Sequence, residues 1–219
     1  MPYAVHEIYA SYQGEGAMSG TPAVFCRLRG CNLWSGHEHT RTQAKCRFCD
    51  TQFVGAYGTN GGVFTRTALV KKILSCWQKN AHKEQYARSH NPYIIMTGGE
   101  PMLQLDTPLI DALHTHGCRV AIETNGTLPV PDSIDWICVS PKFGTEIQQK
   151  TGHELKVVWP QSYTRQDLNA MAHWHFKHFF LQPLDDARKN RNFASTMATC
   201  AHNSPWRLSL QTHKILDIP

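Results

Sequence analysis

The sequence has no long hydrophobic run, no low-complexity tract, no heptad pattern and no internal repeat. Its most apolar stretches, at 93–96 and 134–139, are far shorter than the roughly 20 residues that cross a bilayer. Residues 1–10 include Glu7 and no long apolar run, so we expect neither a secretory signal nor contact with a membrane. These absences favour a cytoplasmic protein, whose thiols stay reduced.

Charge is also sparse. Charged residues make up 18% of the 219 residues, and the formal net charge is only +5. Lys and Arg are scattered and no known nucleic-acid-binding motif occurs, so we expect no direct contact with nucleic acid. Hydrophobic residues make up 41%, which is enough for a buried core, and the length predicts a single domain over residues 1–219.

What the sequence does contain is an alternation of strand-like and helix-like segments, which predicts an α/β fold with parallel strands. Short runs rich in β-branched and aromatic residues predict strands at 24–28, 93–96, 119–123, 136–139, 155–158, 178–181 and 207–210. Apolar spacing predicts helices at 65–78, 107–115, 164–174 and 192–202. Thr107 precedes Pro108 and is expected to cap the second of these helices, and Gly117 follows as a stop.

Residues 31–62 show no periodicity and contain Cys31, Cys46 and Cys49 in the pattern C-x14-C-x2-C. A C-x2-C pair brings two sulfurs within reach of one metal centre, and a loop can deliver a third. Two interpretations stay open on this spacing alone. One is a structural zinc, with His37 or His39 as a fourth ligand. The other is an iron–sulfur cluster with three protein ligands and one iron left open.

The turns that follow six of the predicted strands separate these interpretations. They lie at 97–101, 123–126, 140–142, 159–160, 182–185 and 211–214, and most carry polar, Gly or Pro residues. In a parallel α/β barrel such turns share one face, and active sites lie there. The paired Gly98 and Gly99 would let a ligand approach the backbone closely. A structural zinc module has no need of this arrangement.

Several motifs together resemble a known superfamily. The three-cysteine loop with Phe48 before its last cysteine, Gly-Gly-Glu-Pro at 98–101 and Glu-Thr-Asn-Gly at 123–126 resemble the radical S-adenosylmethionine enzymes. The run Tyr-Gln-Gly-Glu-Gly at 12–16 and Cys-Asn-Leu-Trp at 31–34 are similar to the 7-carboxy-7-deazaguanine synthase family within that superfamily. So are Ser-Pro-Lys at 140–142, Glu-Leu-Lys-Val-Val at 154–158 and Leu-Ser-Leu-Gln-Thr-His-Lys at 208–214. The usual cysteine pattern there is C-x3-C-x2-C; this chain extends the first gap to fourteen residues, as some members do.

The resemblance covers essentially the whole chain and implies a fold. We expect an incomplete (β/α)6-like partial TIM barrel with reduced helix content, since only about four helices are counted against six or seven strands. Residues 31–62 would form its irregular cluster-binding loop. A homodimer is also implied only by the resemblance, as is an electron donor of the flavodoxin or ferredoxin kind.

The cofactors implied are a [4Fe–4S] cluster on Cys31, Cys46 and Cys49, with S-adenosylmethionine on the fourth iron as the source of a 5′-deoxyadenosyl radical. Glu100 would be the partner of the methionine ammonium. The other cofactor contacts carried over from the family are Phe48, Cys49, Asp50, Gly99, Ser140, Pro141, Lys142, Gln182, Pro183, Leu184 and Asp185. Mg²⁺ is implied as well, at Thr51, because a hard cation takes oxygen ligands.

The reaction implied is the conversion of 6-carboxy-5,6,7,8-tetrahydropterin to 7-carboxy-7-deazaguanine with loss of ammonia, a lyase step towards queuosine and other 7-deazapurines. The substrate contacts carried over are Tyr12, Gln13, Gly14, Glu15, Arg27, Thr97 and Pro219. Arg27 also fits on chemistry alone, because a guanidinium pairs with a carboxylate. The rival interpretations are another radical enzyme, such as a glycyl-radical activator, which leaves 13–16 unexplained, and a zinc-stapled nucleic-acid-binding module.

Overall fold

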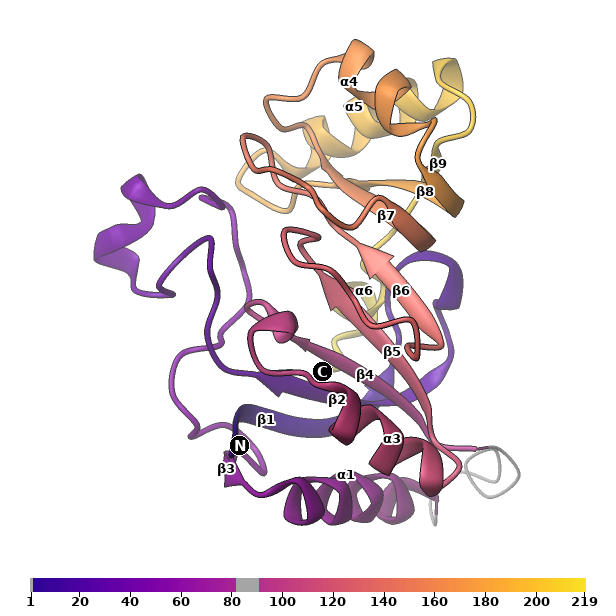
Figure 1. Cartoon of the computed structure of the whole chain (residues 1–219). Helices are drawn as coiled ribbons and strands as arrows, with labels where there is room; N and C mark the ends of the chain where they lie inside the picture. The colour runs from indigo at the N-terminus through magenta and orange to yellow at the C-terminus, as the bar shows by residue number, and fades with distance from the viewer. Residues whose placement is uncertain (1, 82–90) are drawn as a thin grey trace.

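The chain folds around one curved sheet, shown in the computed structural model of Figure 1, which describes residues 2–81 and 91–219. In this part of the chain the sheet has nine strands in the order β3-β1-β2-β4-β5-β6-β7-β8-β9. The strands are β1 (Tyr3–Tyr12), β2 (Pro22–Leu28), β3 (Gly62–Phe64), β4 (Tyr93–Gly98), β5 (Arg119–Thr124), β6 (Trp136–Val139), β7 (Thr151–Trp159), β8 (His175–Pro183) and β9 (Arg207–Leu208).

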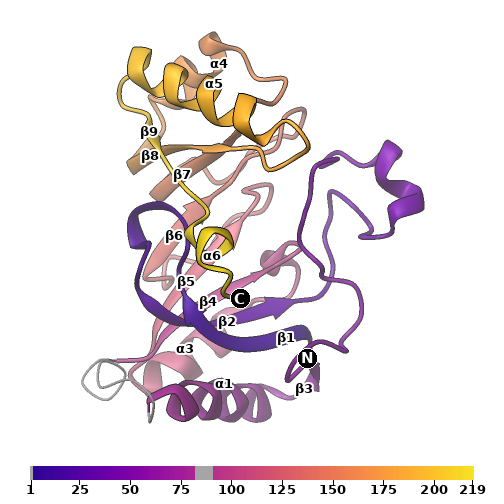
Figure 2. The ribbon, with the colours of Figure 1, turned by 180° about the vertical axis from the view of Figure 1, so that it is seen from behind.

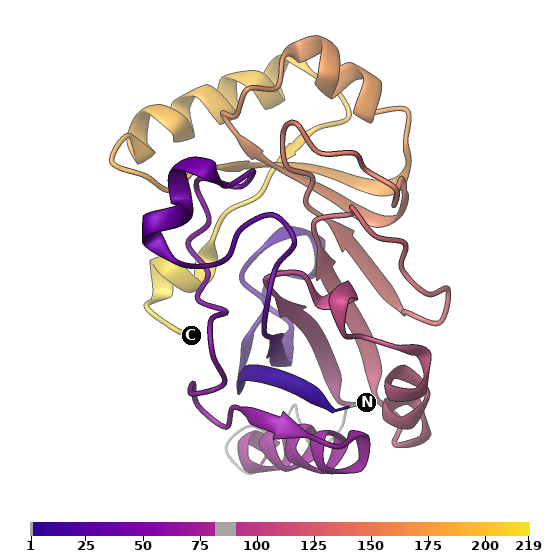
Figure 3. The same cartoon turned by 60° about the vertical axis from the view of Figure 1, so that its left-hand side comes forward.

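Neighbouring strands from β2 through β9 are all paired in parallel. The remaining pairs are antiparallel: β1 pairs in this way with both β2 and β3. The sheet curves without closing, which confirms the predicted α/β fold of an open, partial barrel (Figure 3).

The main helices cover the outer, convex face of the sheet (Figures 1 and 3). They are α1 (Arg66–Ala81), α3 (Thr107–Thr115), α4 (Arg165–Met171) and α5 (Lys189–His202). The main core lies between these helices and the strands, where Ile73 of α1 and Leu109 of α3 are fully buried against Ile94 and Ile122. Burying each such side chain stabilises the fold by about 1.5–3 kcal/mol. The inner, concave face is left for other segments.

Residues 31–62 lie over that open concave side (Figure 3). They contain one short helix, η2 (Glu38–Gln43), and a small core of their own, in which Trp34 and Phe53 meet edge to face. The Arg41 guanidinium stands 4.1 Å from the centre of the Trp34 ring and stabilises this core from outside. A segment with no periodic pattern is thus ordered by a few aromatic contacts.

The C-terminal segment returns to the N-terminal one. Helix α6 (Thr212–Leu216) lies beside the turn that follows β1, where the Thr212 backbone N–H donates to the Gly14 carbonyl oxygen at 2.9 Å (Figure 2). None of the helices in the described part of the chain has the length and apolar character needed to span a bilayer.

All seven predicted strands and all four predicted helices are present, with shifted ends. Helix α3 has the predicted bounds, but the predicted cap is wrong by one position: Asp106, and not Thr107, accepts the backbone N–H of Leu109. Gly117 follows that helix in a left-handed conformation, φ +72°, as a stop residue does.

Candidate active site

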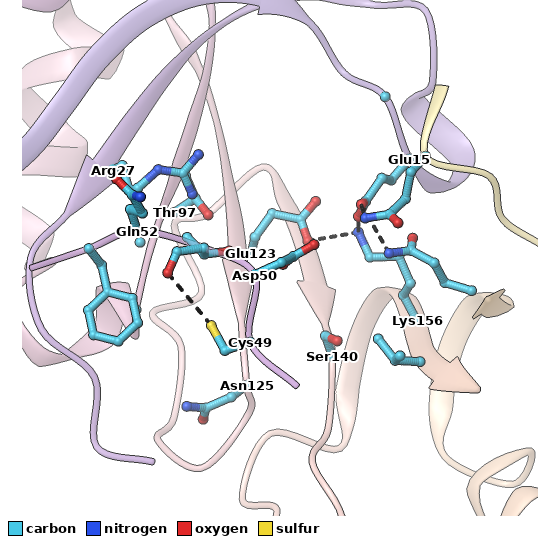
Figure 4. Close-up of a pocket in the computed structure, with 18 of the residues that line it drawn as sticks. Glu15, Arg27, Cys49, Asp50, Gln52, Thr97, Glu123, Asn125, Ser140 and Lys156 are labelled. Carbon is cyan, nitrogen blue, oxygen red and sulfur yellow. Dashed lines mark hydrogen bonds and ion pairs between the residues drawn. The ribbon is translucent and has the colours of Figure 1, made fainter. Parts of the chain in front are cut away.

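A cavity of about 390 Å³ lies at the carboxyl ends of the parallel strands. Its walls are the concave face of the sheet, the 31–62 segment and residues of the C-terminal segment (Figure 4). Every site residue predicted from the sequence lines this cavity except Glu100 and Pro141. The fold therefore gathers around one cavity site residues that lie as far apart in the sequence as Tyr12 and Pro219.

Cys31, Cys46 and Cys49 form part of one wall, and none is in a disulfide. A hydrogen bond between the Cys46 and Cys49 sulfurs raises the pKa of Cys46 and lowers the pKa of Cys49 to about 6. The Leu33 backbone N–H donates to the Cys31 sulfur at 3.4 Å. These three free thiols on one cavity wall, two of them in contact, are the donor set that an iron–sulfur cluster requires.

Two other candidate ligands lie elsewhere. The rings of His37 and His39 stack on each other with centres 5.7 Å apart, and neither residue is among those that line the cavity. Within residues 2–81 and 91–219, no three His, Cys, Asp or Glu side chains are gathered tightly enough to enclose a single metal ion.

Gly98 and Gly99 let two backbone segments meet behind the cysteines. A Cβ on Gly99 would lie 2.2 Å from the Gly30 carbonyl oxygen and 2.6 Å from Cys31 Cβ. The Glu100 backbone N–H donates to that same Gly30 oxygen at 2.8 Å. The sequence predicts that these glycines admit a ligand; the structure shows that they also admit the backbone that carries Cys31.

Glu100 is fully buried behind the cavity wall. Its carboxylate accepts the backbone N–H groups of Met102 and Asn125 at 2.9 and 2.8 Å, and the Thr124 hydroxyl at 2.8 Å. It therefore ties the turn after β4 to the end of β5. Pro141 is also buried, and beside it Lys142 Nζ donates to the Ser140 carbonyl oxygen and hydroxyl at 2.6 and 2.8 Å.

A buried ion-pair network occupies another wall of the cavity. The Lys156 ammonium on β7 lies 2.7 Å from Glu15 Oε2 and 3.0 Å from Glu123 Oε2, and only 4% of the lysine side chain is exposed (Figure 4). Glu15 Oε1 also accepts the side-chain amides of Gln182 and Gln211, each at 3.0 Å. Burial opposes ionisation of Glu15, but the Lys156 charge and these bonds outweigh it and lower the pKa of Glu15 to about 2.

Arg27 reaches the cavity from β2. Its Nε donates to Glu7 at 2.8 Å and its Nη2 donates to the Tyr9 hydroxyl at 3.1 Å. The Tyr9 ring stacks on Phe25, with ring centres 5.2 Å apart, and this stacking fixes the hydroxyl to which the Arg27 guanidinium donates. Within the described chain Nη1 has no protein partner, which leaves it available to an anionic ligand.

The C-terminal segment closes one side. The Lys214 ammonium lies 2.7 Å from Asp50 and 2.7 Å from Asp185, and so links the cysteine loop to the turn after β8. The Ser11 hydroxyl donates to a Pro219 oxygen at 2.5 Å. Both Lys214 and Pro219 line the cavity.

Sequence reasoning missed several residues that line the cavity, chief among them Glu123, Lys156, His213 and Lys214. The 154–158 motif did contain a signal. Glu154 and Lys156 alternate there with Leu155 and Val157, so two charged side chains point to the face opposite the apolar core. A buried charged side chain such as that of Lys156 needs a partner of opposite charge, and Glu15 and Glu123 are its partners.

No protein-family model matches the chain. A curated protein of Burkholderia multivorans is 52% identical to it over 221 residues, which cover 100% of both chains, and is named 7-carboxy-7-deazaguanine synthase. The chain belongs to the 7-carboxy-7-deazaguanine synthase family. Synthases of Bordetella pertussis and Bacteroides thetaiotaomicron are 49% and 40% identical, over 100% and 98% of this chain and 100% and 97% of theirs.

The fold agrees with this family. The crystal structure of QueE from Escherichia coli matches with a TM-score of 0.72 and 25% identity, over 97% of this chain and 95% of the other. The 7-carboxy-7-deazaguanine synthases are radical S-adenosylmethionine enzymes, which implies a [4Fe–4S] cluster and S-adenosylmethionine. A full-length match of this kind is at odds with both rival interpretations, the zinc-stapled module and the glycyl-radical activator.

Proposed function

We propose that this chain converts 6-carboxy-5,6,7,8-tetrahydropterin to 7-carboxy-7-deazaguanine with loss of ammonia, a step towards queuosine. The observation that carries the proposal is the composition of one cavity. It combines three free cysteines, a guanidinium with an open N–H group, and a pair of half-buried carboxylates. A radical enzyme for a bicyclic acid with N–H donors needs these groups together.

Cys31, Cys46 and Cys49 would hold the cluster. When bound, the cluster and S-adenosylmethionine supply the radical that begins the ring contraction. The protein orients the reactants and excludes water. Phe48, Asp50 and the turns at 140–142 and 182–185 would enclose the adenosyl group, and Lys214 would hold Asp50 and Asp185 in place. Glu100, expected from the sequence to pair with the methionine ammonium, is proposed instead as a structural support of this wall, because it is fully buried behind the cavity and its carboxylate accepts three hydrogen bonds there.

The substrate would be held at two ends. Arg27 Nη1 would pair with its carboxylate, because Nε and Nη2 are already fixed by Glu7 and Tyr9. Glu15 and Glu123 would accept from the amino and amide N–H groups of the pyrimidine ring. Figure 4 shows Arg27 and Glu15 at opposite sides of the cavity, as a ligand bound by both ends requires.

Mg²⁺ is proposed at Thr51, together with oxygens of the substrate carboxylate and water. Thr51 lines the cavity, and its carbonyl oxygen lies 3.8 Å from the Cys49 sulfur, so the proposed Mg²⁺ ligand is a neighbour of a proposed cluster ligand. We expect Thr51→Val to lower turnover and to remove its dependence on added Mg²⁺, and Thr59→Val, outside this cavity, to change neither.

We also propose an acidic flavodoxin or ferredoxin as electron donor, since the exposed Lys45 and Arg47 flank Cys46. A homodimer is proposed from the family resemblance alone. The cytoplasm is proposed as the compartment because all eight cysteines are free thiols in this fold.

The test begins with anaerobically purified, reconstituted protein. We expect about four irons per chain, and formation of 7-carboxy-7-deazaguanine, followed by mass, when S-adenosylmethionine, dithionite, Mg²⁺ and 6-carboxytetrahydropterin are added. Cys31→Ala should lose the iron, whereas Cys200→Ala, outside the cavity, should keep it. Protein that cleaves S-adenosylmethionine but leaves the pterin unchanged would refute the substrate. Colourless protein with one zinc would refute the cluster as well.

A further inference from the structure

Lys156 is the most deeply buried charged group of the cavity, and the proposed chemistry gives it no role of its own. Its side chain is 4% exposed, against 18% for Glu15 and 21% for Glu123. It stands on β7 between the two carboxylates, one from the turn after β1 and the other from β5 (Figure 4). The ammonium is therefore the cation that joins these three segments.

The groups around the pair are all hydrogen-bond donors. Glu15 Oε1 accepts from the amides of Gln182 and Gln211, and Glu123 Oε1 accepts from the Gln13 amide at 3.0 Å. The Gln13 side-chain oxygen Oε1 in turn accepts the backbone N–H of Glu15 at 3.1 Å. Each carboxylate is thus held at a fixed angle, with its remaining lone pairs open to the cavity.

The backbone of the turn that carries Glu15 is also held by side chains of two other segments. Glu154, two residues before Lys156 on the same strand, accepts the Ala17 backbone N–H at 2.9 Å. Ser209 accepts the Gly16 backbone N–H at 3.0 Å. Strand β7 therefore sets both the position of the turn, through Glu154, and the direction of the Glu15 carboxylate, through Lys156.

The charges do not cancel. Lys156 faces both Glu15 and Glu123, and the Glu154 carboxylate acts on it as well, so the carboxylates around this ammonium outnumber it. Without Lys156 the two carboxylates would lose their shared cation, and burial would then raise the pKa of Glu15 and favour its protonated form. Protonation gives the carboxyl group an O–H donor, which cannot accept a hydrogen bond from an N–H group of the ligand.

We propose that Lys156 is a positioning residue that holds Glu15 and Glu123 as two fixed hydrogen-bond acceptors, and that this pair selects substrates by the N–H donors of their 2-amino-4-oxopyrimidine edge. The inference rests on the proposed function, because it assumes a pterin in the cavity. Lys156 does not supply the proton that accompanies ammonia, because two carboxylates hold its own proton in place.

The experiment uses the reconstituted holoenzyme and two unreactive probes. 6-Carboxypterin carries the 2-amino group, and 6-carboxylumazine has an oxygen in its place. We expect the wild type to bind the pterin at least about tenfold more tightly, since a site built to accept an N–H group rejects an analogue without it. Lys156→Met should abolish this preference, and Lys156→Arg should restore most of it. Lys150→Met, just before β7 and outside the cavity, should keep it.

A purely structural role would give a different result. We expect Lys156→Met to raise the KM for 6-carboxytetrahydropterin by about tenfold or more, and to leave iron content and the KM for S-adenosylmethionine within about twofold. Equal losses in iron, cofactor and pterin binding would overturn the proposal, and so would an unchanged ratio between the two probes. If Lys156→Met does not fold, Glu123→Gln decides by the same ratio, because the amide exchanges one acceptor oxygen for a donor.

Failure of the proposed function looks different again. In that case the wild type itself would bind neither probe and would leave 6-carboxytetrahydropterin unchanged. A wild type that turns over the pterin but binds both probes equally would leave the function standing and remove the positioning role of Lys156.

Discussion

Gly99 packs directly against Gly30, so closely that a Cβ on Gly99 would lie 2.2 Å from the Gly30 carbonyl oxygen. Cys31 is the next residue, and its Cβ would be 2.6 Å away. The position of Cys31, a proposed cluster ligand, thus depends on the absence of a side chain at Gly99, 68 residues further along the sequence (99 − 31).

Gly99→Ala should therefore displace Cys31. We expect the reconstituted variant to hold less than about half of the wild-type iron and sulfide, because one of three ligands moves. Gly117→Ala is the matched control: it puts Ala into a left-handed conformation in open space, which costs about 1–2 kcal/mol of stability but should leave iron binding intact. Wild-type iron content in Gly99→Ala would show that the contact does not position Cys31.

Gly16→Ala tests the turn that carries Glu15. A Cβ there would lie 1.9 Å from Glu154 Oε1, at a left-handed φ of +64°. We expect a loss of stability greater than the about 1–2 kcal/mol of backbone strain alone, together with a higher KM for the pterin. Gly20→Ala is the control: its φ is +86° and a Cβ there would meet nothing within 4 Å, so it measures the backbone strain without the clash. Equal denaturation midpoints for the two variants would contradict the clash.

Lys214→Met tests the link between the cysteine loop and the turn after β8. Lys214, Asp50 and Asp185 are each about a third to a half exposed, so stability should change by less than about 1 kcal/mol. The KM for S-adenosylmethionine should nevertheless rise severalfold, because both segments proposed to enclose it are released. Arg188→Met removes an exposed ion pair to Asp186 in the same region and should leave that KM unchanged.

Acid should weaken the fold through Glu15. Its pKa is about 2 in the folded protein and near 4.5 when unfolded, so the unfolded chain binds the proton more readily. The stability that Glu15 contributes is complete above about pH 4.5 and is lost as the pH falls towards 2. Urea titrations of wild type and Glu15→Gln should differ most above pH 4.5 and converge below it. A constant difference across this range would mean that the ionised form is not what stabilises the turn.

The parallel part of the fold could be predicted from sequence because each buried strand is a short apolar run bounded by turn residues. Strand β1 was missed because its side chains do not alternate cleanly: a register shift between Val5 and Glu7 breaks the two-residue period. Helix α6 was missed for another reason. It has five residues, no buried residue and no side-chain cap, and is held only by contacts such as that of Lys214 with Asp50.

The candidate site was predictable where a motif has a local reason, as with the C-x2-C pair or Gly98 and Gly99. The partners of Lys156 could not be predicted in this way. Glu15 and Glu123 lie on two other segments of the sheet's concave side, and their contact depends on curvature and register, which no local pattern encodes. The order within 31–62 was equally hidden, since it depends on the contacts of Trp34 with the Arg41 guanidinium over its ring and with Phe53 edge to face.

The return of the C-terminal segment to the first turn also has a consequence for synthesis on the ribosome. The hydrogen-bond partner of Gly16, Ser209, is synthesised 193 residues later, and that of Ser11, Pro219, is synthesised 208 residues later. At about 5–20 residues per second, the first half of the cavity is made about 10–40 seconds before the second. Cys31, Cys46 and Cys49, the proposed cluster ligands, are thus translated well before the C-terminal residues that complete the cavity wall, which would leave the proposed cluster site open during synthesis.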